Sequence, residues 1–480
     1  MTAPCILWFR QDLRLGDNPA VEAVRHGAVL PVFVLDDAAA GELAYGGAAR
    51  WWLHHSLDAL QRDLEARGAS LLLLKGDAVA LLAELARRTG ATAIHAGWLA
   101  EPWARAQEVA LAERLSADGR RLELHRSSHL LHPASILTGS GRLYTVYAPF
   151  ARKVLASGEV PPPIDAPDRL NGVTPPAGLS LADLALTPVP PQPNWAAEFG
   201  TAWTPGEAGA RERLAQFIED GLENYATRRN EPGVEGSSNL SPHLRWGEIS
   251  PRQVWHAARG AGGAEALPFL REILWREFSH HLLWHRPEMP REALRAPFAS
   301  FPFAPDQDLL HAWQGGRTGY PIVDAGMRQL WRIGWMHNRV RMIAASLLVK
   351  HLLQPWQDGA AWFMDTLVDA DPANNSASWQ WIAGSGTDAS PYFRVFNPIL
   401  QGEKFDPEGA YVRRWLPELA RMPSRYIHRP YEAPEEIRHA AGVTEQSYPR
   451  PVVDHATGRA RALAALRATA RGPVPEGVEA

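Results

Sequence analysis

Short apolar runs alternate with helical stretches over the first 130 residues, and this alternation restricts the fold more than any other feature of the sequence. Between the runs, apolar residues recur at three-and-four spacing over residues 48–67, 78–89 and 103–118. The runs that we expect to be buried strands are CILWF, AVLPVFVLD, SLLLLK, ATAIHAG and RLELH. The pattern predicts a doubly wound α/β domain with a parallel sheet over residues 1–130.

A doubly wound sheet binds ligands at the carboxyl ends of its strands, so a ligand site is expected there in the first domain. No glycine turn of the form G-x-G-x-x-G follows the first strand, and G-x-x-x-x-G-K-[ST] occurs nowhere in the chain. A dinucleotide held on a Rossmann glycine turn is therefore not expected.

Proline separates this region from the rest of the chain, with eleven prolines in residues 156–205. Proline at this density cannot continue as helix or central strand, so we predict an extended interdomain connector over residues 131–205. Helical periodicity then returns, and we predict an all-helical domain over residues 206–470. Its predicted helices cover residues 206–222, 265–285, 322–332, 336–353 and 408–420. Residues 471–480 form a polar tail that we expect to be disordered.

The overall composition is that of an ordinary globular protein: 480 residues, 46% hydrophobic and 21% charged, with a formal net charge of -4. This charge indicates no extended nucleic-acid surface, so any site for a polyanion has to be local. The single cysteine, Cys5, excludes an internal disulfide, and no run of about 18 apolar residues predicts a membrane span. We expect a monomeric, cytoplasmic protein without membrane contact.

The segment DADPANNSASWQW, residues 369–381, gathers acids, neutral amides and two indoles. Asp371 followed by proline is a good helix start, because the carboxylate can cap free backbone amides. A helix from that point puts Asp371, Asn375 and Trp379 on one face, with Trp381 about 200° from Trp379. A neutral amide beside acids and an indole suits a polar, redox-active ring. An asparagine satisfied by the backbone is an equal alternative.

Three further segments have both a functional and an ordinary interpretation. SSNLS, residues 237–241, puts hydroxyl groups at an expected helix N-terminus, which favours phosphate or is a plain serine-rich cap. LREILWREFSHHLLWH is either a site helix or an amphipathic helix with a charged edge, and GWMHNRVRM is either a basic patch or a solvated face. Neither HExxH nor CxxC occurs, so no metal site is predicted.

Together these segments resemble the DNA photolyase and cryptochrome family. The resemblance extends from LWFRQDLRLGDNPA through TGYPIVDAGMRQLW and GWMHNRVRMIAASLLVKHLL to DADPANNSASWQW and YFRVFNPILQGEKFDPEGAYVRRWLPEL. It implies an α/β domain, a connector and a helical domain that buries FAD in a U shape. By resemblance, the residues lining the FAD are Tyr225, Ser237, Ser238, Asn239, Leu240, Ser241, Phe269, Arg341, Asp369, Ala370, Asp371 and Asn375. Of these, Asn375 is expected to face the central-ring nitrogen of the flavin.

Two positions separate repair enzymes from light sensors in this family. Plant cryptochromes carry an aspartate where this chain has Asn375 and a tyrosine where it has Trp381, so both positions are of the photolyase type. A neutral amide supports a reduced anionic flavin, whereas a buried carboxylate would have to be protonated or repel it. The resemblance implies repair of cyclobutane pyrimidine dimers in DNA by electron transfer from light-excited, reduced FAD. The alternatives are a cryptochrome-type signalling flavoprotein or, if the resemblance is fortuitous, a structural protein without cofactor.

The lesion site of the family also has counterparts in this chain. Trp275 and Trp381 resemble the indoles that cradle a flipped-out dimer, because flat apolar walls suit an extruded lesion. Glu272, Asn338 and Met342 are expected to contact its bases, and the last two stand where enzymes for (6-4) lesions have histidines. The implied catalytic residues are Asn375, Glu272 and Met342. The expected phosphate contacts are Arg229, Arg276 and Arg339, so binding should weaken as the salt concentration rises.

Electron supply to the flavin departs from the family pattern. Relatives often reduce their flavin through three tryptophans, and Trp379 and Trp356 match the inner two. The distal position is Phe303, and phenylalanine is a poor electron donor. Photoreduction is therefore expected to be slow or to use another residue, such as Trp362 or Trp313.

The antenna site is a second departure. Folate-binding relatives have Asn-Glu where this chain has Trp103 and Ala104. Folate, a deazaflavin, a second flavin and no antenna chromophore all remain open.

Overall fold

The structure is a computed structural model that describes residues 3–188 and 194–471. The chain divides into two compact units. Unit 1 comprises Met1–Glu223, Ser238–Pro287 and Val368–Asn374, and unit 2 comprises Asn224–Ser237, Glu288–Leu367 and Asn375–Ala480. The tail predicted to be disordered, residues 471–480, lies outside the described residues except for Arg471.

A parallel sheet in unit 1 follows the predicted apolar runs. Its strands lie in the order β3-β2-β1-β4-β5, each pair is parallel, and β6 pairs with β2. The strands are β1 (Cys5–Phe9), β2 (Ala28–Leu35), β3 (Leu72–Lys75), β4 (Ala93–Gly97), β5 (Arg121–His125) and β6 (Asn171–Gly172). The doubly wound α/β prediction is confirmed, including the strand at RLELH.

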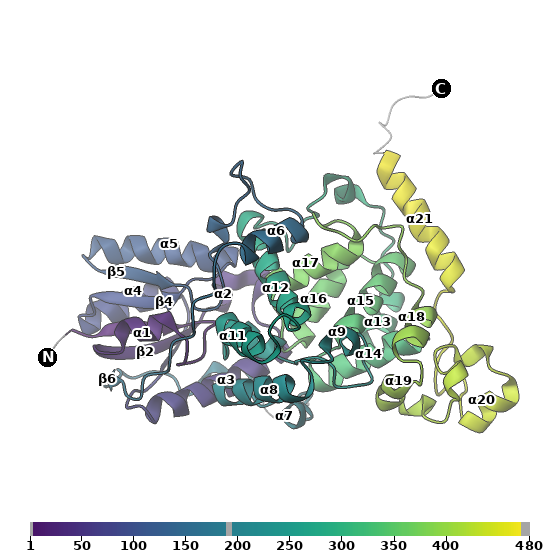
Figure 1. The fold of residues 1–480 in the computed structure, drawn as a ribbon, viewed down its shortest axis with the longest axis horizontal. Helices are drawn as coiled ribbons and strands as arrows, with labels where there is room; N and C mark the ends of the chain where they lie inside the picture. Colours follow the sequence, from purple (N-terminus) through teal and green to yellow (C-terminus); the bar gives the residue numbers. More distant parts are fainter. Residues whose placement is uncertain (1–2, 189–193, 472–480) are drawn as a thin grey trace. The chain divides into compact units, whose positions relative to one another are not determined.

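One face of the sheet packs against helices α4 (Ala78–Thr89) and α5 (Pro102–Ala117), as Figure 1 shows. Side chains alternate between the two faces along a strand, so the even-numbered apolar residues of β1 and β2 point to the same face. Core residues on this face without exposed surface include Ile6, Leu30, Val32, Leu82, Ile94, Ala96 and Leu111. The apolar runs are thus continuous because both faces of the sheet are buried.

The remaining helices of unit 1 extend the α/β core. They are α1 (Pro19–Val24), α2 (Asp37–Ala40), α3 (Gly47–Glu65), α6 (Tyr147–Leu155), α7 (Phe199–Ala202), α8 (Glu207–Asp220), α10 (Ser241–Trp246), α11 (Pro251–Gly262) and α12 (Leu267–His285). Helix α11 starts with a complete capping box, in which Ser250 and Gln253 each bond the backbone N–H of the other. Proline at its first position also favours a helix start there.

Unit 2 is helical. Its elements include α9 (Tyr225–Arg228), α13 (Gln307–Gln314), α14 (Pro321–Ile333), α15 (Asn338–Ser346), the π-helical turn η5 (Leu347–His351), α16 (Trp356–Thr366), α18 (Pro398–Phe405), α19 (Ala410–Trp415), η6 (Pro417–Leu419), α20 (Glu435–Ala441) and α21 (His455–Arg471). Helix α17 (Pro372–Ala383) starts in unit 1 and continues in unit 2. Among the described residues, no helix has the length and apolar character needed to cross a bilayer.

Two predicted helices are wrong in their extent. The helix predicted over 336–353 is α15 followed by η5, where the backbone bonding lengthens and Leu352 N–H donates to Leu347 O at 3.1 Å. The helix predicted over 408–420 ends at Trp415. Pro417 disfavours the helical conformation for the residue before it, and a separate 3-10 turn follows.

The proline-rich connector is more ordered than predicted. Helix α6 lies within the range predicted as connector, and β6 adds a short strand beside β2. Leu179 N–H also donates to Leu73 O at 2.9 Å, which ties the segment to β3. Single backbone bonds of this kind leave no apolar periodicity, so the sequence pattern did not predict them.

Candidate functional site

Asp371 directly precedes helix α17 and caps it, as the sequence predicts. Its Oδ1 accepts a hydrogen bond from the Asn374 backbone N–H at 2.7 Å, which satisfies a free amide of the first turn. Its Oδ2 lies 3.3 Å from His280 Nε2 and 3.8 Å from Arg245 Nη1. One carboxylate in unit 1 therefore caps a helix and joins a buried charge cluster.

Nearby cations keep this carboxylate ionised. Burial would raise the pKa of Asp371, but His280, Arg245 and Arg276 together lower that pKa well below its usual range. Arg245 is positioned in turn by Ala370 O, to which its Nε donates at 2.6 Å. The Arg245 guanidinium thus binds the backbone of the predicted cofactor segment at Ala370 and also faces the carboxylate of Asp371.

Asp369 and the SSNLS segment meet in unit 1. Ser241 Oγ donates to Asp369 Oδ2 at 2.6 Å, and Ser241 is the first residue of α10, so the hydroxyl-rich segment does precede a helix. Asn239 has φ of 53°, in the left-handed region that asparagine tolerates better than most residues. Ser238 Oγ accepts the N–H of buried Leu240 at 3.4 Å. Ser237, which precedes them, belongs to unit 2 and is half-buried.

Two aromatic residues predicted to line the cofactor are buried, each in its own unit. Phe269 in unit 1 packs on Phe217 with ring centroids 4.6 Å apart. Tyr225 in unit 2 starts α9, and the Arg229 guanidinium lies 5.3 Å from its ring centroid. Burial of both rings fits residues that form a wall rather than a solvated surface.

Three predicted lesion and phosphate residues lie on α12 and are half-buried: Glu272, Trp275 and Arg276. Trp275 stacks on Tyr147, with ring centroids 3.6 Å apart and an interplanar angle of 6°. Arg276 Nη1 donates to Ser128 O at 2.8 Å, which fixes the guanidinium against unit 1. The Tyr147 hydroxyl also donates to a backbone carbonyl of α12, so one face of the Trp275 indole is covered by a fixed ring.

Three arginines of unit 2, Arg229, Arg339 and Arg341, lie around His337. Burial and the Arg229 charge both lower the pKa of Arg339. Burial and the charges of Arg341, Arg339 and Arg229 lower the pKa of His337 to about 4. Arg339 is positioned by Asn230, whose Oδ1 accepts from its Nη2 at 2.6 Å and its Nε at 3.2 Å. A positive cluster with a neutral His337 is suited to an anionic ligand.

Asn338 and Met342 lie one turn apart on α15. Asn338 is the first residue of the helix and is exposed, and Met342 is half-buried four residues later on the same side. Trp381 of α17 is also half-buried, and Ser390 N–H donates to its backbone carbonyl at 3.0 Å. Each of the three offers accessible side-chain surface in unit 2.

Asn375 is oriented by a hydrogen bond within unit 2. Its Nδ2 donates to Ala360 O at 3.0 Å, which leaves Oδ1 as the amide atom able to accept from a ligand. Trp379, one helical turn later, is buried and lies 6.1 Å from Trp313 between ring centroids. Gly359 makes room for it, because a Cβ there would lie 2.1 Å from Trp379 Cη2.

Trp356 and Phe303 line one small apolar hollow in unit 2, together with Tyr392. Trp356 is a predicted electron donor, and Phe303 is the position where the predicted row of tryptophans is interrupted. Both residues therefore line the same hollow. Elsewhere in unit 2, Trp331 is 54% exposed and stacks on Trp362 with centroids 6.0 Å apart. This stacked indole pair reaches solvent through Trp331.

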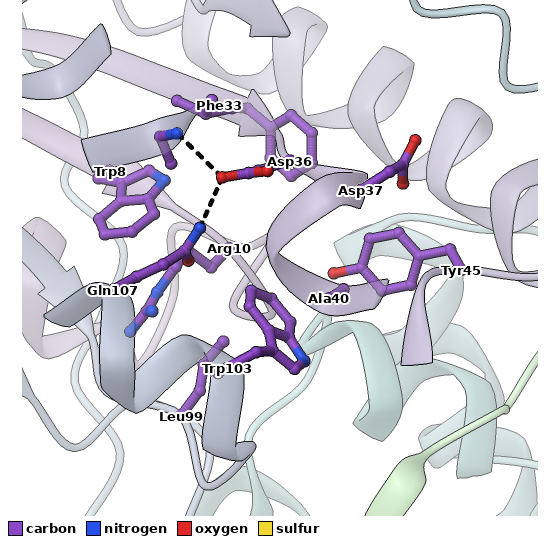
Figure 2. A pocket seen from close by; sticks show the side chains of 12 residues that line it. Trp8, Arg10, Phe33, Asp36, Asp37, Ala40, Tyr45, Leu99, Trp103 and Gln107 are labelled. Carbon is purple, nitrogen blue, oxygen red and sulfur yellow. Dashed lines mark hydrogen bonds between the residues drawn. The ribbon is translucent and has the colours of Figure 1, made fainter. Parts of the chain in front are cut away.

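A separate hollow lies in unit 1 beyond the carboxyl ends of β1 and β2, where strand order reverses between β1 and β4 (Figure 2). Aromatic, charged and small or aliphatic side chains form its lining, together with one glutamine. The lining residues are Trp8, Arg10, Phe33, Val34, Asp36, Asp37, Ala40, Tyr45, Ala78, Leu99, Trp103 and Gln107. A hollow therefore lies where the doubly wound pattern predicts a ligand, and its occupant stays a prediction.

The polar groups of this hollow are partly engaged. Asp36 Oδ2 accepts Gln107 Nε2 at 2.8 Å and the Ala78 N–H at 3.0 Å, as Figure 2 shows. Among the described residues, the buried Nε1 atoms of Trp8 and Trp103 have no hydrogen-bond acceptor. Since buried N–H groups are rarely left unpaired, these indoles suit a planar ligand that carries acceptor atoms.

Several site residues were not predicted from the sequence. Tyr147, Asn230, Arg245 and His280 each contact a predicted residue but lie outside the motifs of that residue. Residues lining the unit 1 hollow, such as Trp8 and Arg10, stand at the strand ends where the fold predicted a ligand. The rule that doubly wound sheets bind ligands at the carboxyl ends of their strands is the signal in the sequence that could have identified these residues.

Comparisons with known proteins agree with this arrangement. A family model described as DNA photolyase matches residues 5–168, and one described as FAD binding domain of DNA photolyase matches residues 269–468. The chain is 48% identical over 475 residues to the deoxyribodipyrimidine photo-lyase of Agrobacterium fabrum, covering 97% of this chain and 98% of that protein.

A solved structure, a bacterial class III photolyase from Agrobacterium tumefaciens, is similar with a TM-score of 0.94 and 48% identity, covering 98% of each chain. Cryptochrome-2 of Arabidopsis thaliana is 38% identical over 477 residues, covering 96% of this chain and 78% of that protein.

Proposed function

The chain belongs to the DNA photolyase and cryptochrome family, and from this premise we propose that it repairs cyclobutane pyrimidine dimers in DNA with light. The observation that carries the proposal is the likeness, over nearly the full length of both chains, to a deoxyribodipyrimidine photo-lyase. The match to a cryptochrome is more distant and covers less of that protein. Repair is therefore the better-supported activity.

The residues of the FAD-binding region suit a flavin. A reduced FAD bound there supplies a light-driven electron for opening the cyclobutane ring and takes that electron back. Asn375, held by Ala360, presents Oδ1 as an acceptor and adds no charge next to an anionic ring. Asp371 and Ala370 are held in unit 1 by His280 and Arg245, which fixes the backbone expected to contact the cofactor.

The residues assigned to the DNA side suit a flipped-out lesion. Trp275 and Trp381 are half-buried indoles that could stack on a base, and Glu272, Asn338 and Met342 would supply polar and polarizable contacts. Arg229 and Arg339 form the positive cluster in unit 2, and Arg276 lies on α12. Damaged DNA would thus be held by local charge on a chain whose formal net charge is -4.

A repair assay tests the proposal. The FAD-loaded, chemically reduced protein is mixed with an oligonucleotide that carries one thymine dimer and is illuminated with near-ultraviolet or blue light. We expect intact thymines to accumulate in the light and not in a dark control. A flavin-loaded protein that restores no thymines would refute the lyase and favour the signalling alternative.

Substitution of Trp381 tests the lesion site within the same assay. Trp381→Ala should weaken binding of dimer-containing DNA by about fivefold to a hundredfold, because aromatic stacking contributes about 1–3 kcal/mol per base. Trp331→Ala, which removes an exposed indole outside the predicted lesion set, is the matched control and should leave that affinity unchanged. Equal losses in the two variants would contradict the assignment of Trp381.

We also propose that the unit 1 hollow binds a second, antenna chromophore. Its aromatic lining and the unpaired indole N–H groups of Trp8 and Trp103 support a planar ligand, with folate, deazaflavin and flavin still the candidates. Trp103→Leu should remove the ligand's absorption from the purified protein and lower the repair rate in dim light at constant FAD content. Trp195→Leu, outside the hollow, should do neither. Identical spectra for wild type and both variants would exclude the hollow as its site.

We also propose domain boundaries at residues 130, 205 and 470. We further propose that the protein is a monomer and is located in the cytoplasm. Their basis is the composition change at the proline-rich stretch and the single cysteine. Sedimentation of the purified protein at micromolar concentration tests the monomer, and a concentration-dependent dimer would contradict it.

A further inference from the structure

His280 of α12 is buried with an oxygen acceptor at each ring nitrogen. Its Nδ1 lies 2.9 Å from the carbonyl oxygen of Arg276, one turn earlier on the helix. Its Nε2 lies 3.3 Å from Asp371 Oδ2. The side chains of His280 and Asp371 are each 4% exposed, so water cannot take the place of either partner.

A ring with a single proton does not fit this environment. A neutral imidazole donates from one nitrogen and presents a lone pair on the other. That lone pair would face either a carbonyl oxygen or a buried carboxylate, and both contacts are repulsive. We propose that His280 is an imidazolium, with a proton on each ring nitrogen, that positions Asp371 and the 369–371 backbone for the cofactor.

The charges around the ring support this assignment. The acids that face the cluster are Asp371, Glu101, which lies 3.3 Å from Arg245 Nη1, and Glu277, which lies 3.5 Å from Arg276 Nη1. Glu277 Oε2 also accepts two backbone N–H groups, from residues 130 and 131, which lower the pKa of this carboxyl while burial raises it. Arg276 and Arg126 both interact with Glu277, whereas an imidazolium at His280 would be the cation nearest Asp371, since its Nε2 lies 3.3 Å from Asp371 Oδ2 and Arg245 Nη1 lies 3.8 Å away.

His129 is the other titratable group in contact with His280, and it has the opposite character. The two rings lie 4.7 Å apart, and His129 stacks on Trp98 with centroids 4.4 Å apart. Among the described residues, neither ring nitrogen of His129 has a hydrogen-bond partner. Burial lowers the pKa of His129 well below its usual value, and the neighbouring cations lower it further. The proposed charge therefore belongs to His280, whose two ring nitrogens each face an oxygen, and not to His129.

This inference rests on the proposed function, because the segment that His280 holds is the predicted flavin segment. Asp371 Oδ1 caps α17 while Oδ2 meets His280, so the ion pair fixes both the acid and the start of the helix that carries Asn375. His280 is a positioning residue: it contacts Asp371, and its effect on the flavin passes through that carboxylate.

Nitrogen NMR of the FAD-loaded protein tests the protonation state directly. With histidine side chains labelled with ¹⁵N, the His280 signals are assigned by their loss from His280→Asn and His280→Gln spectra. At neutral pH we expect both of its ring nitrogens to show the shift of a protonated nitrogen. One protonated and one bare nitrogen would overturn the proposal.

Two amide substitutions separate the two hydrogen bonds. In His280→Asn, the side-chain amide keeps an N–H donor near the position of Nδ1 but has no donor that reaches Asp371. In His280→Gln, the longer side chain places its amide N–H donor toward Asp371. We expect FAD affinity to fall about tenfold to a hundredfold in His280→Asn, the range for losing a charge-assisted bond, and to be partly restored in His280→Gln. His281→Gln, the same substitution at the next buried position, is the matched control and should retain wild-type affinity.

The outcomes distinguish this inference from the proposed function. Full light-dependent repair by a protein with a singly protonated His280 would refute the imidazolium alone. A doubly protonated His280 in a flavin-loaded protein without repair activity would refute the lyase alone. Equal loss of FAD in the Asn and Gln variants would show that the donor toward Asp371 does not position the segment.

Discussion

Individual side chains in this protein are fixed before any ligand arrives. Asn375 is bonded to Ala360, Arg339 to Asn230 and Arg245 to Ala370. Each bond joins a predicted site residue to a residue distant in sequence. A preorganised polar group loses less conformational entropy when a ligand binds, which favours both affinity and geometry.

Phe303 is the residue at which electron supply should respond most to substitution. It lines the same hollow as Trp356, so Phe303→Trp would put a donor indole beside the middle tryptophan. We expect faster photoreduction of oxidised FAD in the presence of an external reductant, measured as loss of its visible absorption. Phe393→Trp, at a ring that is 63% exposed and outside the hollow, should keep the wild-type rate. An unchanged rate in Phe303→Trp would mean that electrons enter elsewhere, as at Trp362 or Trp313.

Arg339 should contribute to DNA affinity without contributing to sequence preference. Arg339→Gln removes one positive charge from the cluster with Arg229, so affinity should fall for any DNA sequence. The slope of log K against log salt should decrease in magnitude by about 0.9, the value for one lost phosphate contact with duplex DNA. Arg425→Gln, at an exposed arginine beside Tyr426, is the control and should keep the wild-type slope. An unaltered slope in Arg339→Gln would remove it from the phosphate contacts.

At the scale of elements, packing of α16 against Trp379 of α17 depends on one glycine. Gly359 has no side chain, and a Cβ there would meet Trp379 Cη2 at 2.1 Å and Leu348 Cδ2 at 2.6 Å. Residues 348, 359 and 379 are buried, so the clash cannot be relieved at a flexible surface. Close packing of this kind specifies where the inner tryptophan lies.

Gly359→Ala should therefore destabilise the protein. We expect a loss of about 1–3 kcal/mol in the free energy of unfolding, typical of overpacking a core, measured by urea denaturation. Gly260→Ala is the matched control within α11, because nothing lies within 4 Å of its new Cβ. That variant should be neutral or gain up to about 1 kcal/mol from helix propensity. Equal stabilities of the two variants would contradict the packing argument.

At the scale of the whole molecule, buried neutral histidines make stability depend on pH. Burial lowers the pKa of His281 and His337 to about 4 and that of His351 to about 3, with neighbouring charges adding to the effect. In the unfolded chain these groups titrate near their usual value of about 6.5. Below that pH the unfolded chain binds more protons than the folded protein, so stability falls as pH decreases toward 4.

We expect the free energy of unfolding to decrease by about 1.4 kcal/mol per pH unit for each of these histidines between about pH 6.5 and 4. His351→Asn should reduce that slope by the contribution of one histidine, about 1.4 kcal/mol per pH unit. The substitution removes the titrating ring whose Nε2 lies 2.9 Å from His455 Nδ1. His439→Asn, at an exposed histidine, should not change it. A slope unaffected by His351→Asn would show that this ring is charged in the folded protein.

The sequence by itself determined the α/β region, the start of α17 at Asp371 and the family, because these follow from local signals: strand-length apolar runs, an acid before proline and long ordered motifs. The sequence did not predict the ends of the helices or the short strand β6, because a π-helical turn and single backbone hydrogen bonds produce no periodic pattern of apolar residues. Only the tertiary structure decided which partners hold the site residues. Hydrogen bonds and ion pairs such as His280–Asp371 and Arg339–Asn230 join residues about a hundred positions apart, and their energies depend on distance in space and on burial, which spacing along the chain does not encode.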